Sequence, residues 1–543
     1  MTGRRPAISR SVPVFSGRRL SLLVLASIGS LAALLLARAL GPSDLWDQTQ
    51  PKTVSYTSDI IANGRWILPI ELGEFPATKP VLYNWLAVPA VWLLGFASEA
   101  AHKFPSVLAV CLCWLALVRL GRRLDPAPDQ SIGWLAGMLF VANYTIFKLG
   151  YLARPDMLLT LWLVLGWMAG GAILAEASGK ADGLRSSSGL RCFFLALAFW
   201  LCVGLAGLTK GPAAITLLVF AVLGGKLIAG RWRAVHSFQW WWGFPLSLAM
   251  LGVWIYGVWR TEPDHLINEL WYNEIYGRVT GTGPEGAHHG PLDLLLGAPY
   301  MALYYLVRFL PWSIPSVIAI VALWRRSRAR SRSRRWHDLG GLGLHLHSAA
   351  VFVIVIVGLY TLSAGKRADY IAAAFAPGAL LAAWWLRDAG SRLGHRWPGF
   401  IPMLAAAVLA VLIVVNEREP AAPVRGFGDE IMAFARRANA QRAGEELPVE
   451  FCWTGDTHLQ AMMGFSRVSG DGPRAVFDHI RAGRPCWVVA GTKTSPPPDF
   501  DVWLRRKRPG VHIRRVVSSA TLPRAHGWPV QVHLYRIDSP GER

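Results

Sequence analysis

The sequence predicts an α-helical membrane protein with about 11 to 13 transmembrane helices and a small extracytoplasmic α/β domain at its C-terminal end. Of the 543 residues, 53% are hydrophobic, and the mean hydropathy is +0.33. Apolar runs of about 20 residues, long enough to cross a bilayer as a helix, recur up to residue 416 and then stop. We therefore assign residues 1–416 to a transmembrane module and residues 417–543 to a separate domain.

The transmembrane module contains many runs with the length and composition of a spanning helix. Their approximate positions are 19–41, 104–120, 131–148, 157–175, 192–209, 211–229, 240–259, 309–324, 347–364, 369–386 and 399–416. Two further apolar stretches, 81–97 and 291–308, contain polar residues or prolines. We expect these two stretches to lie in the membrane interface or to re-enter it from one side.

With that assignment, the short loops rich in Arg and Lys all fall on one side of the membrane. These loops lie within 4–19, 119–123, 180–191, 226–233, 325–335 and 387–396. Basic residues in short loops mark the cytoplasmic side, so the first outer loop (42–103) faces the extracytoplasmic side. The loops also account for much of the net charge of +22, and we expect no nucleic-acid partner.

Beyond residue 417 the pattern is that of alternating strands and helices. Strands are predicted at 448–453, 485–491, 511–517 and 530–537, and helices at 428–442 and 473–483. Cys452 and Cys486 fall in two of the strands, where they could form a disulfide outside the cytoplasm or remain buried thiols.

The segments assigned to the outer face contain a series of polar motifs. In chain order they are "SDIIANGRWILP" (58–69), "ATKPVLYNWLAVPAVWLLG" (77–95), "HKFPSVLAV" (102–110), "ARPDMLLT" (153–160), "LTKGPAAI" (208–215), "NEIYGR" with "HHGPL", "LPWS" (310–313) and "SAGKRADYIAAAFAP" (363–377). Polar residues held at membrane level usually mark a site or a water-filled cavity.

The order of these motifs resembles the GT-C fold glycosyltransferases that use polyprenyl-phosphate sugars. The resemblance is to the superfamily of lipid A aminoarabinose transferases and protein O-mannosyltransferases, and it covers about residues 20–380. It implies a multi-pass enzyme of the inner (plasma) membrane that transfers a sugar with inversion and without a cofactor. The implied donor is a polyprenyl-phosphate-linked sugar.

Members of this family usually carry an Asp-Glu pair just after the first helix, with the Asp taken as catalytic. Thr49 and Gln50 stand at those positions here, and the nearest carboxylate is Asp47. Three alternatives remain open: Asp47 takes the catalytic role, Asp156 carries it, or the enzyme works without that base. A base would assist an acceptor hydroxyl, whereas a phosphate acceptor is already anionic. Lys103 stands where the family usually has an arginine.

Release of a polyprenyl phosphate calls for cations and neutral hydrogen-bond donors directed at the phosphate oxygens. The candidate cations are Lys79, Arg154, Lys210, Arg278, Lys366 and Arg367, and the candidate neutral donors are Tyr83, Tyr370, His288 and His289. The two histidines lack a clear third ligand, so we expect no metal site.

The implied acceptor is lipid A, another envelope glycolipid or a protein hydroxyl, the last as in a protein O-mannosyltransferase-like enzyme. Two alternatives belong to other classes: a lipid-linked-sugar transporter, and a non-catalytic relative that still binds a polyprenyl lipid. A transporter should show charged residues at mid-membrane depth and paired broken helices.

Overall fold

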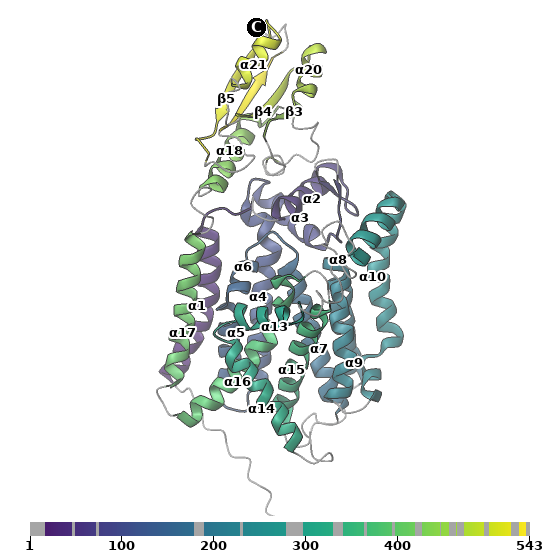
Figure 1. The fold of residues 1–543 in the computed structure, drawn as a ribbon, viewed down its shortest axis with the longest axis vertical. Helices are drawn as coiled ribbons and strands as arrows, with labels where there is room; N and C mark the ends of the chain where they lie inside the picture. The colour runs from purple at the N-terminus through teal and green to yellow at the C-terminus, as the bar shows by residue number, and fades with distance from the viewer. Residues whose placement is uncertain are drawn as a thin grey trace, which may run out of the picture. The chain divides into compact units, whose positions relative to one another are not determined.

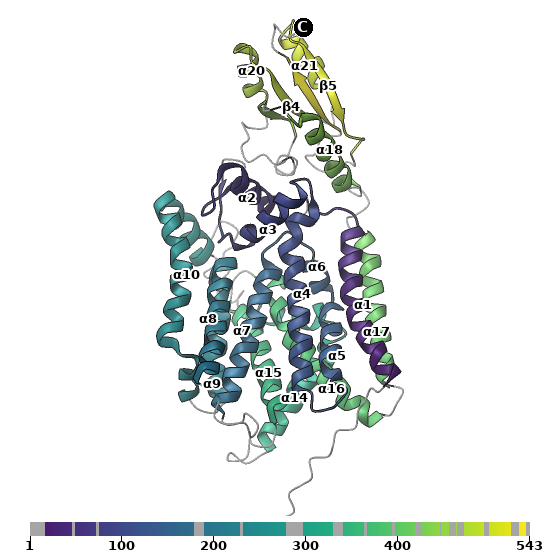
Figure 2. The same ribbon diagram turned by 180° about the vertical axis from the view of Figure 1, so that it is seen from behind.

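The computed structural model describes most of the chain, and its residues group into two compact units (Figures 1 and 2). The described residues are 17–45, 49–71, 75–178, 189–228, 232–277, 297–329, 340–362, 366–393, 397–418, 426–445, 447–454, 463, 472–492, 499–522 and 531–538. The first unit comprises Met1–Leu36, Ser106–Gly150 and Pro155–Leu412, and the second comprises Ala37–Pro105, Tyr151–Arg154 and Ile413–Arg543.

The first unit is helical. It contains α5 (Ser131–Val141), α6 (Tyr144–Leu149), α7 (Asp156–Ala177), α8 (Gly189–Lys210), η1 (Gly211–Ala214), α9 (Ile215–Leu227), η2 (Trp232–Phe238), α10 (Trp240–Thr261), the π-helix η3 (His265–Gly277), α13 (Ala298–Arg308), α14 (Ser313–Ala329), α15 (Gly340–Thr361), η4 (Ala368–Ala374) and α16 (Phe375–Leu393). Most of α1 (Arg18–Leu40), α4 (Glu99–Leu124) and α17 (Trp397–Arg418) also belongs to it.

Small residues allow two of these helices to approach closely. A Cβ atom added at Gly121 of α4 would lie 2.5 Å from the Cα of Gly133 in α5. Within the same unit, α7 packs against α8 and α15, and α16 packs against α5 and α14. These contacts bury large side chains such as Trp167, Trp200 and Trp312.

The apolar helices agree with a multi-pass membrane protein. Among the described residues, 7 helices are long and apolar enough to cross a membrane, or up to 8 if a bent pair is counted as one span. Three shorter apolar helices lie at Leu82–Leu94, Ser131–Val141 and Phe400–Asn416. Of the two stretches expected in the interface or re-entering from one side, one contains the short helix α3 (Leu82–Leu94), and in the other α13 meets α14 at a bend of 120°. Their position in the membrane stays a prediction.

The second unit combines the first outer loop with the C-terminal region. The loop contains α2 (Gln50–Asn63), the strands β1 (Ile70–Glu71) and β2 (Phe75–Pro76), and α3. The C-terminal region contains α18 (Phe427–Arg442), β3 (Val449–Cys452), α20 (Arg474–Arg481), β4 (Cys486–Thr492), α21 (Phe500–Lys507), β5 (Ile513–Ser518) and β6 (Gln531–Ile537).

The predicted C-terminal strands form one sheet in the order β3-β4-β6-β5, in which β3 and β4 are parallel and the other pairs antiparallel. The predicted helices correspond to α18 and α20, whereas α21 was not predicted. Cys452 pairs with Ala490 in the sheet register, four positions from Cys486. That separation is about 13 Å along a strand, so the two cysteines are buried thiols that form no disulfide with each other.

Candidate functional site

In the first unit, a carboxylate and an ammonium group meet at the ends of two packed helices. Asp156 is the first residue of α7, and Lys210 is the last residue of α8. The helix dipole favours an acid at an N-terminus and a cation at a C-terminus. Gly211 follows with φ +57°, a left-handed conformation that suits glycine and ends the helix after Lys210.

The two side chains form a buried ion pair. Lys210 Nζ donates to Asp156 Oδ1, and the side chains are 15% and 4% exposed, respectively. The same Nζ lies 4.9 Å from the ring centroid of Tyr370, whose ring in turn lies 5.3 Å from that of Tyr360. The structure therefore brings three predicted site residues, Asp156, Lys210 and Tyr370, into one cluster. We call the ion pair between Asp156 and Lys210 the acid–lysine pair.

The two other predicted cations of this region lie just before Tyr370 in the chain. Arg367 is 48% exposed and lies 3.9 Å from Asp369, and Lys366 is half-buried. An ammonium with three donors beside an exposed guanidinium is suited to hold a phosphate group, because both can make charge-assisted hydrogen bonds to its oxygens.

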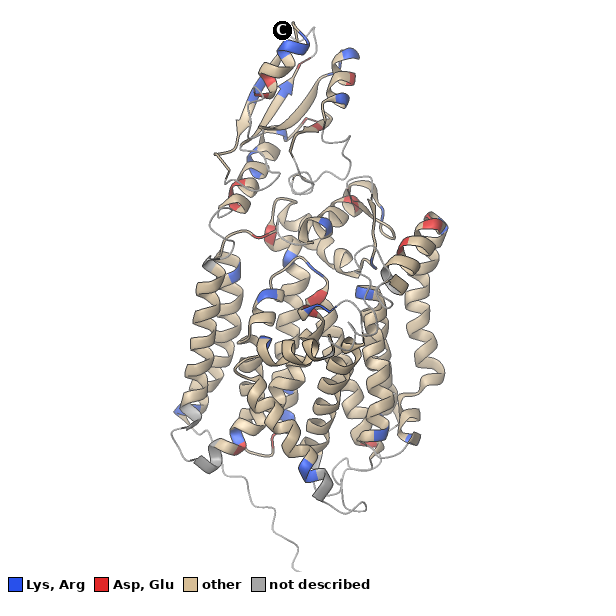
Figure 3. Cartoon of the chain, viewed as in Figure 1, with Lys and Arg blue, Asp and Glu red and all other residues tan. Residues whose placement is uncertain are grey.

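Charged residues in the first unit gather at helix ends (Figure 3). Basic residues occupy the last turns of α4 and α9, with Arg122, Arg123 and Lys226, and two arginines lie near the end of α14. In Figure 3 the last turns of α4, α9 and α14 lie at one end of the helical unit, and the start of α7 lies toward its other end. The acid–lysine pair is thus separated from these basic helix ends along the length of the helices.

In the second unit, the loop after α1 contains a carboxylate that the sequence did not single out. Asp44 Oδ2 accepts a hydrogen bond from Arg38 Nη2 at 2.7 Å, and Asp44 Oδ1 accepts one from Lys103 Nζ. Lys103 also pairs with Glu99, and its side chain is only 1% exposed. We call these four residues the ionic cluster. It holds two positive and two negative charges, so the burial of Lys103 is compensated.

The electrostatics of the ionic cluster keep Asp44 ionised. Burial alone would raise the pKa of the Asp44 carboxyl, but Lys103 and Arg38 hold that pKa well below its usual range. Tyr151 lies against the cluster, with Lys103 Nζ 4.5 Å from its ring centroid. Burial, together with the charges of Glu99 and Asp44, raises the pKa of Tyr151 to about 12, so the phenol stays neutral.

The segment 151–154, which carries Arg154, is fixed by hydrogen bonds to its backbone. The Tyr83 hydroxyl lies 3.1 Å from the carbonyl oxygen of Leu152 and 3.0 Å from that of His102, and it can donate to either. Gln50 Oε1 accepts from the Ala153 amide at 2.8 Å, and Gln50 Nε2 donates to the Asp44 carbonyl at 2.7 Å. Tyr83 therefore binds backbone in this structure, and Arg154 is 4% exposed beside these contacts.

The remaining predicted site residues are less closely placed. Lys79 is half-buried between β2 and α3. Asp47, Arg278, His288 and His289 lie outside the described residues. Among the residues that the structure describes, no group of three or more His, Cys, Asp or Glu side chains could hold a metal ion.

Only one feature of the sequence points to the ionic cluster. Glu99 and Lys103 are four residues apart at the start of α4, the spacing of a helical ion pair. Asp44 and Arg38 join them from a different part of the chain, a contact that spacing along the sequence does not reveal.

No family model matches the chain. The undecaprenyl phosphate-α-4-amino-4-deoxy-L-arabinose arabinosyl transferase of Edwardsiella ictaluri is 26% identical over 389 residues, which are 68% of this chain and 61% of the relative. A second arabinosyl transferase of this name, from Sodalis glossinidius, is 26% identical over 64% of this chain and 57% of its own length. The chain thus spans about 60% of the length of the curated relatives it matches.

The crystal structure of ArnT from Cupriavidus metallidurans bound to undecaprenyl phosphate superposes with a TM-score of 0.62 at 16% identity. The match covers 95% of this chain and 98% of that chain. The fold is therefore that of this transferase, the GT-C fold expected from the motifs, and the resemblance to aminoarabinose transferases is confirmed in sequence and in fold. The protein is a multi-pass membrane protein.

Proposed function

We propose that this protein is an integral-membrane glycosyltransferase that moves a sugar from a polyprenyl-phosphate donor to an extracytoplasmic acceptor. The observation that carries the proposal is the acid–lysine pair, which lies at helix ends remote from the basic helix ends of the first unit in a chain with this transferase fold. The names of the curated relatives, and the undecaprenyl phosphate bound to the solved structure, support the choice of donor.

In the proposed reaction, an acceptor oxygen attacks the anomeric carbon of the sugar on the face opposite the phosphate. The anomeric C–O bond breaks, the configuration inverts, and polyprenyl phosphate leaves with the bonding electron pair. Lys210 and Arg367 would bind the departing phosphate, with Arg154, Lys79 and the other outer cations as further candidates.

Two carboxylates remain candidates for the base that takes the acceptor proton. Asp47 is the first choice, as the acid nearest to the position of the family's catalytic residue. Asp156 is the second choice, and its ion pair with Lys210 supports a different task, because the carboxylate would hold the ammonium in place for a phosphate ligand. An anionic phosphate acceptor would need positioning alone.

We also propose the orientation of the chain. The basic loops would face the cytoplasm, and the acid–lysine pair and residues 417–543 would face the extracytoplasmic side of the inner membrane. Lipid A, another envelope glycolipid and a protein hydroxyl are all compatible acceptors.

The test is transfer from a panel of labelled polyprenyl-phosphate sugars by purified protein. Asp47→Asn, Asp156→Asn and Lys79→Ala are compared with wild type and with Asp478→Asn, a control at an acid whose side chain is 58% exposed. Loss of turnover with retained lipid binding in Asp47→Asn would identify the base. Normal turnover in all three site variants would overturn the proposed site.

The same assay separates the other classes of function. A transporter would move the lipid across a vesicle membrane without breaking the anomeric bond, and a non-catalytic relative would only bind it. Either result with wild-type protein would overturn the proposed transfer reaction.

A further inference from the structure

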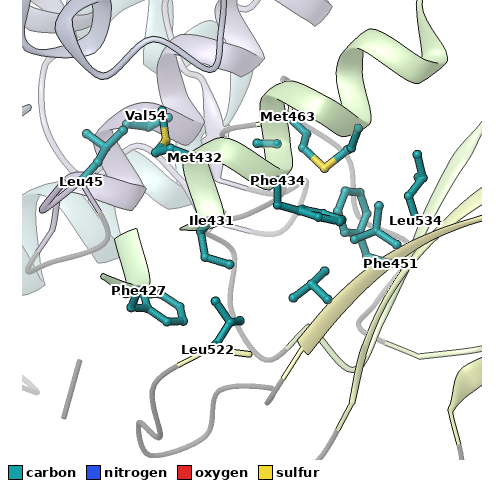
Figure 4. Close-up of a cluster of buried hydrophobic side chains, with 14 of the residues drawn as sticks. Leu45, Val54, Phe427, Ile431, Met432, Phe434, Phe451, Met463, Leu522 and Leu534 are labelled. Carbon is teal, nitrogen blue, oxygen red and sulfur yellow. The ribbon is translucent and has the colours of Figure 1, made fainter. Parts of the chain in front are cut away.

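Helix α18 of the C-terminal region packs directly on the segment that follows α1. Leu45 and Val54 are 0% and 1% exposed, and they belong to the same apolar cluster as Phe427 and Met432 of α18 (Figure 4). Burial of such side chains stabilises the contact, so α18 and the two ends of the segment 45–54 behave as one packed body.

A hydrogen bond also joins α18 to the segment that follows α1. Asp429 Oδ1, in the first turn of α18, accepts from the backbone amide of Ser43 at 2.9 Å. The next residue, Asp44, directs its side chain into the ionic cluster and its carbonyl oxygen to Gln50 Nε2. The backbone at 43–44 is thus held from two sides.

Gln50 links the backbone at Asp44 to the segment that contains Arg154. Its side chain is completely buried, and its two amide atoms join the carbonyl of Asp44 to the backbone N–H of Ala153. Ala153 itself belongs to the apolar cluster of α18. Arg154 is the next residue, so its backbone is placed by these contacts.

We propose that α18, through Asp429, and Gln50 are positioning elements for Arg154, which gives the C-terminal region a task in donor binding. The inference rests on the proposed function, in which Arg154 is one of the candidate cations for the donor phosphate. Neither Asp429 nor Gln50 touches the reacting atoms; both act through the backbone that carries the guanidinium.

The proposal is tested on the full-length protein with Gln50→Met, which keeps the side-chain length but removes both hydrogen bonds, and with Asp429→Ala. We expect Asp429→Ala to raise the KM for the polyprenyl-phosphate sugar about tenfold, the effect of one lost hydrogen bond in a buried setting. Gln50→Met loses two hydrogen bonds and should raise this KM at least as much. The kcat per folded molecule should change less than about threefold. Asp429→Asn keeps the acceptor oxygen and should restore the wild-type KM.

Hydrogen–deuterium exchange gives a second readout that does not depend on activity. Both variants should exchange the amides of residues 43–54 and 151–154 faster than wild type, whereas Asp478→Ala, at an exposed acid of the same region, should not. A variant that merely destabilised the protein would lower the active fraction and leave KM unchanged.

Three results would overturn the inference: unchanged exchange in both variants, faster exchange with an unchanged KM, or failure of Asp429→Asn to restore KM. A wild-type protein that transfers no sugar would instead overturn the proposed function and the role of Arg154 with it. The exchange data would then still decide whether α18 and Gln50 hold the segment.

Discussion

A lysine removed from water needs a partner of opposite charge, and Lys103 and Lys210 have different sets of partners. Lys103 contacts two carboxylates within the ionic cluster. Lys210 contacts one carboxylate and the face of an aromatic ring, and it is the more exposed of the two. An ammonium with two carboxylate partners has little need of an anionic ligand. We therefore expect a structural role for Lys103 and propose a ligand-binding role for Lys210.

The first prediction concerns Lys210. Lys210→Met should lower kcat about 100-fold, because it removes one preorganised cation from the departing phosphate. Lys210→Arg should retain part of the activity. Turnover is measured with the labelled polyprenyl-phosphate sugar.

The control is Lys226→Met, a lysine in the last turn of α9 that lies 5.2 Å from the ring centroid of Trp232. It belongs to the basic group at the other helix ends and should leave kcat unchanged. Equal losses in Lys210→Met and Lys226→Met would contradict the assignment.

The second prediction concerns Asp44 and pH. The folded-state pKa of Asp44 lies below its unfolded value of about 3.9. The carboxylate therefore stabilises the fold fully above that value, and the stabilisation is lost as pH falls through the folded-state pKa. At pH 7, Asp44→Asn should lower the free energy of unfolding by about 3 kcal/mol, since Lys103 and Arg38 lose a shared partner.

The measurement is thermal unfolding in detergent between pH 7 and pH 3. The difference between wild type and Asp44→Asn should be constant down to about pH 4 and shrink below it. A difference that grows on acidification would show that Asp44 is not held as a carboxylate by the cluster.

At the scale of elements, the sequence predicted what depends on local pattern. Long apolar runs located the apolar helices, and short apolar segments located the four C-terminal strands. Both signals depend on the pattern of apolar and polar residues along a single stretch of chain. The break between α13 and α14 falls at the boundary between the ambiguous stretch 291–308 and the predicted span 309–324. The short helix α21 was not predicted, because three consecutive prolines (496–498) precede it in the sequence and prolines are typical of irregular segments.

Contacts between distant segments were not predictable in the same way. Asp44 and Lys103 lie 59 residues apart, and Gln50 and Ala153 lie 103 apart. No spacing rule joins such positions, so the acids favoured from the motifs were Asp47 and Asp156. Lys210 and Asp156 were both predicted site residues, but their ion pair depends on the packing of α7 against α8.

The third prediction concerns helix packing at Gly133. A Cβ atom there would lie 2.3 Å from the carbonyl oxygen of Val118 and 2.6 Å from the backbone nitrogen of Arg122. Backbone atoms cannot rotate away, so Gly133→Ala should lower the free energy of unfolding by about 2 kcal/mol.

The matched control is Gly29→Ala, since a Cβ atom at Gly29 of α1 would meet nothing within 4 Å. Alanine also favours helix more than glycine does, so this variant should be neutral or slightly stabilising. Thermal unfolding in detergent, followed by tryptophan fluorescence, compares the two. Equal stability of both variants would mean that α4 and α5 are farther apart than described.

At the scale of the whole molecule, the charge distribution sets the expected orientation. Short loops rich in Lys and Arg usually stay on the cytoplasmic side of the membrane. The proposed orientation therefore places the basic helix ends of the first unit and the acid–lysine pair in different aqueous compartments. A lipid-linked donor whose headgroup faces outward could reach the pair only in the proposed orientation.

The fourth prediction tests this orientation by cysteine labelling in intact cells, on a background in which the six native cysteines are replaced. Asp478→Cys, in the C-terminal region, should react with a membrane-impermeant maleimide. Ser331→Cys, within the basic loop 325–335, should react only after the membrane is permeabilised. Charge in the basic loops is the cause, so replacing the arginines of 325–335 with glutamine should increase labelling of Ser331→Cys in intact cells. If Ser331→Cys reacts in intact cells with the arginines present while Asp478→Cys does not, the chain is inserted the other way, and the acid–lysine pair could not meet an outward-facing donor.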